Sequence, residues 1–287
     1  MDIQWFPGHM KKTQRMILES IKNVDIVAEV IDARIPMSSR NPDIDELVGE
    51  KPRLIVLNRA DQADPAATRA WSAYFKRRGF AVLETDAKEG KGVNQFSATI
   101  QLALKEKIEH WRAKGLVGRP IRAMVLGVPN VGKSTFINKV AKKKSAKAGD
   151  KPGVTRGKQW VAVDAGLDLL DTPGILWPKF EDPQTGLHLA FTGAVKDEIM
   201  DLESLAAHLM ETLADRYPQA LTERYKLVPQ PGQAGWELIE LAAKKRGFLI
   251  SGGQPDTERM SKILLDEFRG GKLGRFTLEL PPQEEAP

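Results

Sequence analysis

The stretch GVPNVGKS at 127–134 has the residue types needed to hold a nucleoside triphosphate. It fits the pattern Gly-x4-Gly-Lys-Ser and stands between an apolar run and a segment with helical periodicity. Glycines at the two ends of the pattern let backbone N–H groups close around phosphates without a Cβ in the way. Lys133 would reach the β- and γ-phosphates, and Ser134 would offer a hydroxyl to Mg2+. A chance glycine-rich turn is the alternative, and the strand–loop–helix context disfavours it. The predicted nucleotide contacts of this loop are Asn130, Val131, Gly132, Lys133, Ser134 and Thr135.

Two further segments downstream would complete the phosphate chemistry. DTPG at 171–174 ends an apolar run, which places Asp171 to hold Mg2+ and the Gly174 N–H to bond the γ-phosphate. Loss of that phosphate on hydrolysis would release the following segment. The segment 142–158, rich in lysine and arginine, contains Thr155, a second potential Mg2+ ligand. A solvated basic loop is the other interpretation of this segment, and the two are compatible.

The motif LNRAD at 57–61 has the groups to read guanine. The Asp61 carboxylate accepts two N–H donors from the Watson–Crick edge of guanine, which adenine does not offer. Asn58 would bond the other edge and brace the phosphate loop. Ala87, in TDAKEGKG, would supply a backbone N–H to the guanine carbonyl. By itself LNRAD is equally typical of a strand that ends in polar turn residues, so its weight comes from the combination.

The order of these motifs is unusual. The base-reading segment precedes the phosphate loop, whereas a GTPase normally has them the other way round. A circular permutation explains this order, because the termini of compact domains are often close enough to be joined. The sequence places the join near 111–120, in WRAKGLVGRP.

The surrounding pattern predicts the elements that position the motifs. Apolar runs at 24–32, 53–58, 80–85 and 121–128 alternate with helical patterns, which indicates a parallel α/β sheet covered on both faces. Beyond residue 186 helical periodicity dominates, apart from one short edge strand expected in the C-terminal tail. The expected fold is a circularly permuted P-loop GTPase with a three-layer, mostly parallel sheet, followed by a smaller all-α domain. The domain boundaries are 1–178 and 179–287.

Composition excludes several classes of protein. The chain has 287 residues, of which 41% are hydrophobic, so it can bury a full core. It has no cysteine, which excludes disulfides and thiolate metal sites. The net charge is +5 and the pI is about 9.2, a mild basic excess. The N-terminus lacks the apolar core of a signal peptide and no apolar run spans a bilayer, so we expect a cytoplasmic protein.

With this order of motifs, the sequence resembles the circularly permuted GTPases, and in particular the ribosome biogenesis GTPase A (RbgA/YlqF) family. The resemblance covers nearly the whole chain and includes IQWFPGHMKK, VIDARIP, LNRAD, GVPNVGKS, PGVTRG, DTPGIL and DEFRGGKLGR. The family usually has lysine where this chain has Arg59, whose alkyl stem can cover the base equally well. Asp86 stands where the family commonly has serine. The contact expected there comes from the backbone of the next residue, so it should survive.

Family membership implies an activity and partners. It implies GTP hydrolysis stimulated by the ribosomal particle and a role late in assembly of the large ribosomal subunit, with no membrane or DNA partner. Many GTPases orient the attacking water with glutamine after Asp-x-x-Gly, but this chain has Ile175 there. The resemblance points instead to His9 in WFPGHM, a group able to orient or deprotonate water. An exposed His9 ordered only by rRNA is the alternative.

Two other features carry expectations about ions and RNA. In potassium-dependent relatives, an asparagine at the position of Asn130 helps hold K+ against the phosphates; a turn-forming asparagine is the alternative. Basic residues follow one another near the C-terminus, either as rRNA contacts or as a solvated helix face. Trp236 and Phe248 are expected to pack in the core rather than stack on bases. The candidate RNA-binding residues are Lys244, Lys245, Arg246, Arg259 and Lys262.

Three functions remain open from the sequence. A GTP-driven ribosome assembly factor is the leading one. A nucleotide-gated RNA-binding module with little turnover is the second. An RNA-modifying or metabolic enzyme is the third, although the sequence offers no further nucleophile–base set or metal site for it. The cofactors expected for the leading function are GTP, Mg2+ and K+.

Overall fold

The computed structural model of the chain describes residues 9–141, 159–164, 166–177 and 180–282. The described residues fall into two compact units. The sheet unit contains the residues up to 177 and those from Glu279 onward, and the helical unit contains residues 180 to Leu278. The sequence pattern places the whole chain after residue 178 with the helices. The structure differs at the C-terminal end, where the chain returns to the sheet unit.

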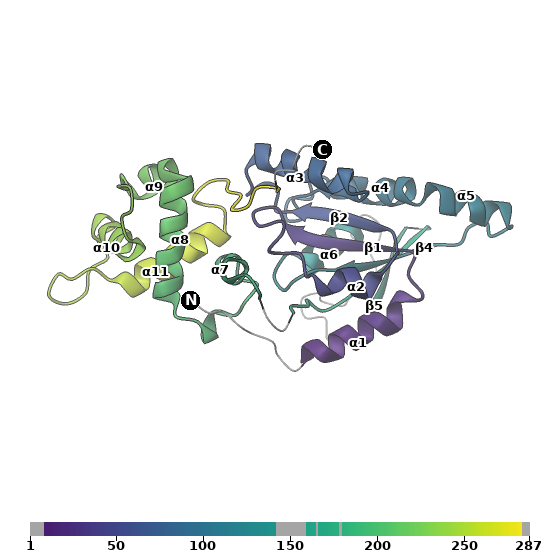
Figure 1. The fold of residues 1–287 in the computed structure, drawn as a ribbon, viewed down its shortest axis with the longest axis horizontal. Coiled ribbons are helices and arrows are strands. Elements are labelled where there is room, and N and C mark those ends of the chain that lie inside the picture. The colour runs from purple at the N-terminus through teal and green to yellow at the C-terminus, as the bar shows by residue number, and fades with distance from the viewer. Residues whose placement is uncertain (1–8, 142–158, 165, 178–179, 283–287) are drawn as a thin grey trace. The chain divides into compact units, whose positions relative to one another are not determined.

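The sheet unit is built on one sheet with the strand order β3-β2-β1-β4-β6-β5 (Figure 1). All neighbouring pairs are parallel except β5 and β6, which are antiparallel. The predicted mostly parallel sheet is therefore confirmed. Because the carboxyl ends of parallel strands share one edge, the motifs that follow β2, β3, β4 and β6 are brought to the same side. The strands are β1 (Ile26–Asp32), β2 (Arg53–Asn58), β3 (Ala81–Glu84), β4 (Ile121–Leu126), β5 (Gln159–Asp164) and β6 (Leu167–Asp171).

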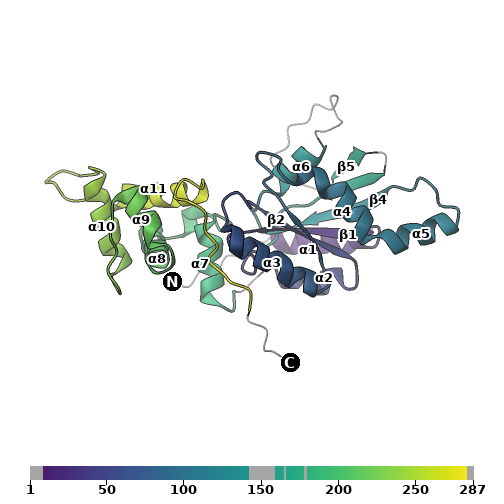
Figure 2. The ribbon, with the colours of Figure 1, turned by 90° about the horizontal axis from the view of Figure 1, so that it is seen from above.

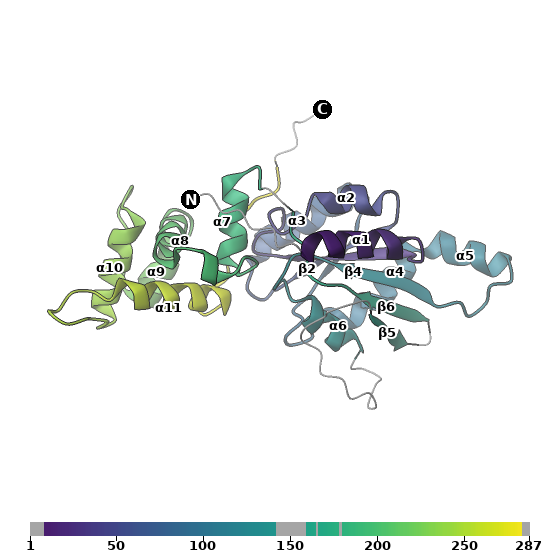
Figure 3. The ribbon, with the colours of Figure 1, turned by 90° about the horizontal axis from the view of Figure 1, so that it is seen from below.

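Helices cover both faces of this sheet and give the three predicted layers. Figure 2 shows α4 and α6 on one face and α2 and α3 on the other. Figure 3 shows α1 lying beside α2. The short α2 follows the VIDARIP segment and is not predicted by the sequence pattern, because it is too short to show helical periodicity. The helices are α1 (His9–Ile21), α2 (Asp43–Val48), α3 (Pro65–Arg77), α4 (Phe96–Ala103), α5 (Lys105–Ala113) and α6 (Lys133–Ala141), with a 3-10 turn η1 (Val93–Gln95) before α4.

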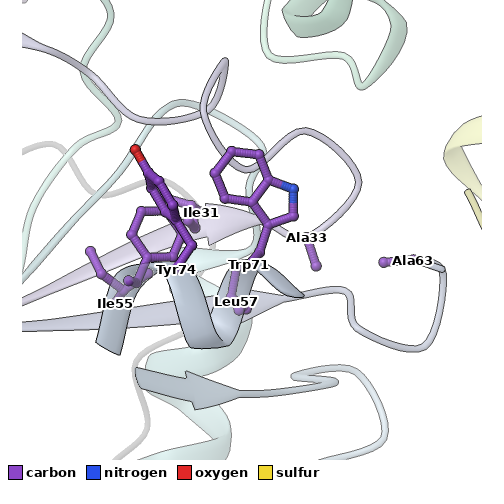
Figure 4. Close-up of a cluster of buried hydrophobic side chains, with 8 residues drawn as sticks. Ile31, Ala33, Ile55, Leu57, Ala63, Trp71 and Tyr74 are labelled. Carbon is purple, nitrogen blue, oxygen red and sulfur yellow. The ribbon is translucent and has the colours of Figure 1, made fainter. Parts of the chain in front are cut away.

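The core between β1, β2 and α3 fixes the strands that lead to the site. Trp71 and Phe75 of α3 stack with their ring centroids 5.6 Å apart. They belong to one buried cluster with Ile31 of β1 and Leu57 of β2, and Figure 4 shows Trp71 beside these two residues. Asp64 caps the N-terminus of this helix, and its side chain accepts from the Ala67 N–H. This packing holds the ends of β1 and β2 immediately before the polar residues that follow them.

The C-terminal segment of the sheet unit makes specific polar contacts instead of a strand. The expected edge strand is wrong, because the described residues after Arg275 join no ladder. The Trp71 indole N–H donates to the Glu279 carbonyl over 2.9 Å. The Glu279 carboxylate accepts from the backbone N–H groups of Met37 and Ser38 over 2.7 and 3.0 Å. The side chain and the carbonyl of Glu279 therefore hold this segment in place of the strand pairing that the sequence predicts.

The helical unit has its core between α8, α10 and α11. Leu205 and Leu209 of α8, Ala242 of α10 and Leu264 of α11 are fully buried. Trp236, expected in this core, is 58% exposed, so that prediction is wrong; Leu238 and its neighbours form the buried face of the helix instead. No helix among the described residues combines the length and the apolar character needed to cross a bilayer. The elements are α7 (Pro183–Phe191), η2 (Asp197–Ile199), α8 (Leu202–Arg216), α9 (Pro218–Tyr225), α10 (Gly235–Lys245) and α11 (Thr257–Arg269).

Candidate nucleotide-binding site

Asn58, the last residue of β2, contacts the phosphate loop directly. Its Nδ2 donates to the Val131 carbonyl over 2.8 Å. A Cβ built on Gly132 would lie 2.4 Å from the same Nδ2, and Gly132 has a φ of 97°, so no residue with a side chain fits there. The two segments that occur in reversed order in the chain are therefore neighbours in space.

The other side of the Asn58 amide holds the third predicted segment. Its Oδ1 accepts from the Ala87 N–H and from the Thr85 hydroxyl, both over 3.1 Å. One buried side chain thus joins the end of β2, the TDA segment and the phosphate loop. The Ala87 N–H is predicted to bond the guanine carbonyl, and here it donates to Asn58. Its role toward guanine stays a prediction.

A cavity of about 170 Å³ opens between these segments. It brings together residues from LNRAD, from the TDA segment and from the phosphate loop. Gln62 and Lys88 also line it, and sequence reasoning misses both because they follow the motifs without belonging to a pattern. The lining residues are Asn58, Arg59, Asp61, Gln62, Asp86, Ala87, Lys88, Gly132 and Thr135.

The carboxylate predicted to read the base has an unusual electrostatic environment. Burial raises the pKa of Asp61, and the nearby Asp86 carboxylate raises it further, while Arg59 opposes both. The Asp86 Oδ1 accepts the Glu89 N–H over 3.0 Å. Asp86 precedes Ala87, whose backbone N–H is the predicted contact, and its own charge also raises the pKa of Asp61. Two N–H donors from a ligand would stabilise the ionised carboxylate and lower this pKa again.

Arg59 connects the base-reading segment to a buried ion pair. It adopts a left-handed backbone with φ 59°, and its Nη2 donates to the Asn130 carbonyl over 3.0 Å. Its Nε lies 3.6 Å from an oxygen of Asp32, which Arg34 also binds over 2.7 Å. Burial would raise the pKa of Asp32, but the two guanidinium groups outweigh it and hold that pKa below its usual value. The VIDARIP segment contains this pair, but residue types alone do not show that it reaches the site.

Lys133 lies on the phosphate loop at the start of α6. Its ammonium donates to the carbonyls of Gly127 and Val128 over 3.0 and 2.8 Å, and the residue is only 6% exposed. Burial lowers its pKa to about 8, against the pull of the Asp171 carboxylate. A Cβ on Gly174 would lie 3.1 Å from this ammonium, so the DTPG segment touches the phosphate loop.

The oxygen ligands of this part of the site suit Mg2+. Ser134 lies in the first turn of α6, directly after the loop that follows β4, and Asp171 ends the neighbouring parallel strand β6 opposite Val125. A hydroxyl and a carboxylate are hard oxygen donors of the kind that Mg2+ prefers. Thr155 lies outside the described residues.

His9 and Asn130 are the two other residues predicted to contribute to hydrolysis. His9 is the first residue of α1, and its side chain is not among those described. Asn130 has a φ of 58°, a conformation that asparagine tolerates better than most residues, which agrees with its interpretation as a turn former. Ile175 is fully buried, so the residue after DTPG does not reach a water molecule.

The basic residues proposed for RNA belong to the helical unit, and several have intramolecular partners. Arg246 lies 2.8 Å from Glu267. Arg259 lies over the Phe248 ring, 4.3 Å from its centroid. Lys262 pairs with a glutamate one turn earlier over 2.5 Å, and Lys244 lies 4.0 Å from Glu240.

Comparisons with known proteins agree with this geometry. A family model described as "50S ribosome-binding GTPase" matches residues 122–227. The chain is 50% identical to Ribosome biogenesis GTPase A of Bacillus cereus, over 99% of this chain and 95% of that protein. It is 35% identical to mouse Mitochondrial ribosome-associated GTPase 1, over 96% of this chain and 90% of that protein. Among solved structures, GDP-bound YlqF has a TM-score of 0.68 at 29% identity and covers 92% of this chain and 98% of its own. GNP-bound YlqF from T. maritima has a TM-score of 0.65 at 28% identity, with 94% of this chain and 98% of its own covered.

Proposed function

The chain belongs to the ribosome biogenesis GTPase A family and hydrolyses GTP, and from that premise we propose that it assembles the large (50S) ribosomal subunit at a late stage. The observation that carries the nucleotide part is Asn58, which bonds both the phosphate loop and the segment of Ala87 beside the cavity lined by Asp61. The names of the relatives support the ribosomal part. The protein would act in the cytoplasm and bind rRNA of precursor particles in a nucleotide-dependent way, with no membrane or DNA partner.

Nucleotide selection is the first test of this proposal. Asp61 would accept two N–H groups of guanine, and its desolvated carboxylate would lack partners against adenine. ATP should therefore compete with a fluorescent GTP analogue at least about a hundred-fold less well than GTP. Equal competition by ATP would remove the proposed base-reading role of the cavity.

Hydrolysis would use the groups around Lys133. Ser134 and Asp171 would hold Mg2+, which supplies positive charge to the β- and γ-phosphates. Lys133 would move from the loop carbonyls to the phosphates, and the Gly174 N–H would bond the γ-phosphate. Thr155 would contribute a ligand only with the triphosphate bound.

We propose that His9 orients or deprotonates the attacking water, since Ile175 is buried and apolar. His9→Ala should keep GTP affinity and slow particle-stimulated turnover at least about ten-fold. His110→Ala, an exposed histidine of α5, is the matched control and should leave turnover unchanged. Equal turnover of the His9 variant and the wild type would contradict the assignment.

Potassium is a further proposed cofactor, held with the help of Asn130 against the phosphates. The cation would add positive charge where an arginine finger acts in other GTPases. Turnover measured in potassium and again in sodium, at equal ionic strength, tests this role. Equal rates in the two salts would leave Asn130 as a turn former only.

The helical part, which follows residue 178, would contact rRNA, and the sheet part, with residues 1–178 as its main segment, would form the GTPase domain. Hydrolysis would change the contacts of Gly174 and so act through the chain that continues into the helices. The proposed rRNA contacts are Lys244, Lys245, Arg246, Arg259 and Lys262.

The experiment that tests the whole proposal compares GTP hydrolysis with and without large-subunit precursors. Strong stimulation, together with sedimentation on the particle that differs between a GTP analogue and GDP, is the expected result. Binding to the particle with flat, negligible turnover would instead favour a nucleotide-gated RNA-binding module.

A further inference from the structure

The helical unit contains a pocket of about 470 Å³ between α8, α10 and α11, the helices that pack together in Figure 1. Glu203 and Glu211 of α8 and Glu240 of α10 line it, together with Trp236 of α10. The described lining contains no lysine or arginine. The pocket is therefore acidic in a chain whose net charge is +5.

The charges of these carboxylates are only partly compensated. Glu203 accepts the Thr257 hydroxyl over 2.6 Å, and Glu211 accepts the Gly235 N–H over 2.9 Å. Both donors are neutral. The basic side chains near these carboxylates lie at long distances: His208 is 3.5 Å from Glu211, and Lys244 is 4.0 Å from Glu240. Such a group of carboxylates attracts a cation.

A second feature of the pocket points independently to a ligand. Ser261 of α11 lines the pocket and is fully buried, and its hydroxyl has no hydrogen-bond partner among the described residues. Most buried side-chain polar groups have one. Because the hydroxyl is closed off from solvent, a ligand in the pocket would satisfy this oxygen only after the neighbouring side chains shift.

The walls of the pocket are held in place before any ligand binds. A Cβ on Gly235 would lie 2.0 Å from the Ala207 carbonyl oxygen, so α10 begins in direct contact with α8. Trp236, the next residue, lines the pocket and is 58% exposed. An exposed tryptophan ring beside carboxylates is a favourable site for a guanidinium group, through cation–π and ionic interactions together.

We propose that this pocket binds an arginine side chain presented by a basic segment of a partner protein. The guanidinium would stack on Trp236 and donate to Glu203 and Glu240. Its planar set of five donors fits several acceptors at once. The carboxylates repel RNA phosphates, so the partner is a protein. The inference goes beyond the proposed function, because it assigns a protein contact that involves neither the nucleotide nor rRNA.

Fluorescence anisotropy of a labelled peptide of alternating arginine and glycine, titrated with the full chain, tests the proposal. Saturable binding is expected. A Glu203→Gln, Glu240→Gln double variant should bind at least about ten-fold more weakly, and Trp236→Ala about three-fold or more. Glu223→Gln, which removes a charge from the exposed surface of α9, is the matched control and should bind like wild type.

Several outcomes would overturn the proposal. The pocket variants could bind the peptide as tightly as wild type, or the control could lose as much affinity as they do. Loss of binding to labelled single-stranded oligouridine RNA in the pocket variants, with peptide binding intact, would assign the pocket to RNA. Thermal unfolding midpoints equal to that of wild type would show that each variant is folded. Unchanged GTP hydrolysis in the variants would keep this test separate from that of the proposed function.

Discussion

Each unit of the molecule contains a buried carboxylate that holds two arginines, but the two clusters have different consequences. In the sheet unit, Asp32 binds Arg34 over 2.7 Å and lies 3.6 Å from Arg59. In the helical unit, Glu267 binds Arg246 over 2.8 Å and also pairs with Arg224. In both, burial opposes ionisation and the arginines outweigh it, so the pKa of each carboxyl is held below its usual value.

The two clusters differ in the further contacts that one arginine of each makes. Arg59 also donates to the Asn130 carbonyl of the phosphate loop, so the Asp32 cluster braces that loop. Arg246 ends at Glu267 and lies over the Tyr225 and Phe248 rings, so its charge serves the packing of the helices. The same local interaction therefore braces the phosphate loop in one unit, and in the other it engages an arginine that is proposed to contact RNA.

The largest effect is expected from Asp32→Asn. Loss of this charge leaves Arg34, which is 1% exposed, buried without its ion pair, and such a change typically costs about 3–5 kcal/mol. Arg59 also loses an anchor, so GTP affinity should fall about ten-fold. Urea unfolding and titration with a fluorescent GTP analogue measure the two effects.

Asp45→Asn is the matched control for Asp32→Asn. Asp45 pairs with Arg40 and Arg53 in the same unit, but its side chain is 54% exposed, and exposed pairs contribute about 1 kcal/mol or less. Unchanged GTP affinity is expected. If the Asp32 variant resembled this control, the cluster would not brace the nucleotide site.

A smaller and separate effect is expected from Glu267→Gln. The Tyr225 hydroxyl donates to Glu267 over 2.7 Å, and glutamine can keep that bond but not the two ion pairs. We expect a loss of about 1–3 kcal/mol, visible as faster amide hydrogen exchange in α9 and α11. GTP affinity should not change. A weakened nucleotide site in this variant would contradict the contrast between the clusters.

This contrast also shows what the sequence can and cannot predict. The alternation of apolar runs and helical patterns predicts the sheet, because strand burial and helix periodicity are local properties. The order of the motifs along the chain predicts the permutation. The meeting of Asn58 with the phosphate loop follows from the motifs themselves. The contact between Asp32 and Arg59 depends on the left-handed backbone conformation of Arg59, which no spacing rule indicates.

The helical unit is harder to predict for a related reason. The numbers of lysines and arginines give the charge of a segment but not its partners, so Arg246 looks available in the sequence although Glu267 binds it. Trp236 looks like a core residue because of its type, yet its position one residue into α10 turns it outward. The buried side of that helix is set by tertiary packing on α8, which the sequence does not show.

RNA binding should separate the lysines of α10 from Arg246. Lys244→Ala with Lys245→Ala should weaken binding to an rRNA fragment about three- to ten-fold and lower the slope of the salt dependence by roughly one for each phosphate that the variant no longer binds. Arg246→Ala should instead lower the unfolding midpoint, with a smaller loss of RNA affinity. Filter binding across a salt series measures both. If Arg246→Ala lowered the slope of the salt dependence as much as the two lysine substitutions do, Arg246 would bind RNA phosphates despite its ion pair with Glu267.

The smallest effect concerns a third buried charge, Lys133, which donates to loop carbonyls rather than binding a carboxylate as Arg34 and Arg246 do. Its pKa is lowered to about 8, so the free protein loses this proton as the pH rises through that value. Phosphates would restore the pKa, and nucleotide binding should therefore take up protons above pH 8 and weaken with rising pH, by at most about ten-fold per pH unit. Calorimetry at pH 8.5, in buffers of different ionisation enthalpy and with Mg2+ present, should show uptake of roughly 0.7 proton, and little at pH 7. The absence of a buffer-dependent heat at pH 8.5 would mean that Lys133 keeps its proton without a nucleotide. The buried cation of the phosphate loop would then be as firmly charged as the paired arginines.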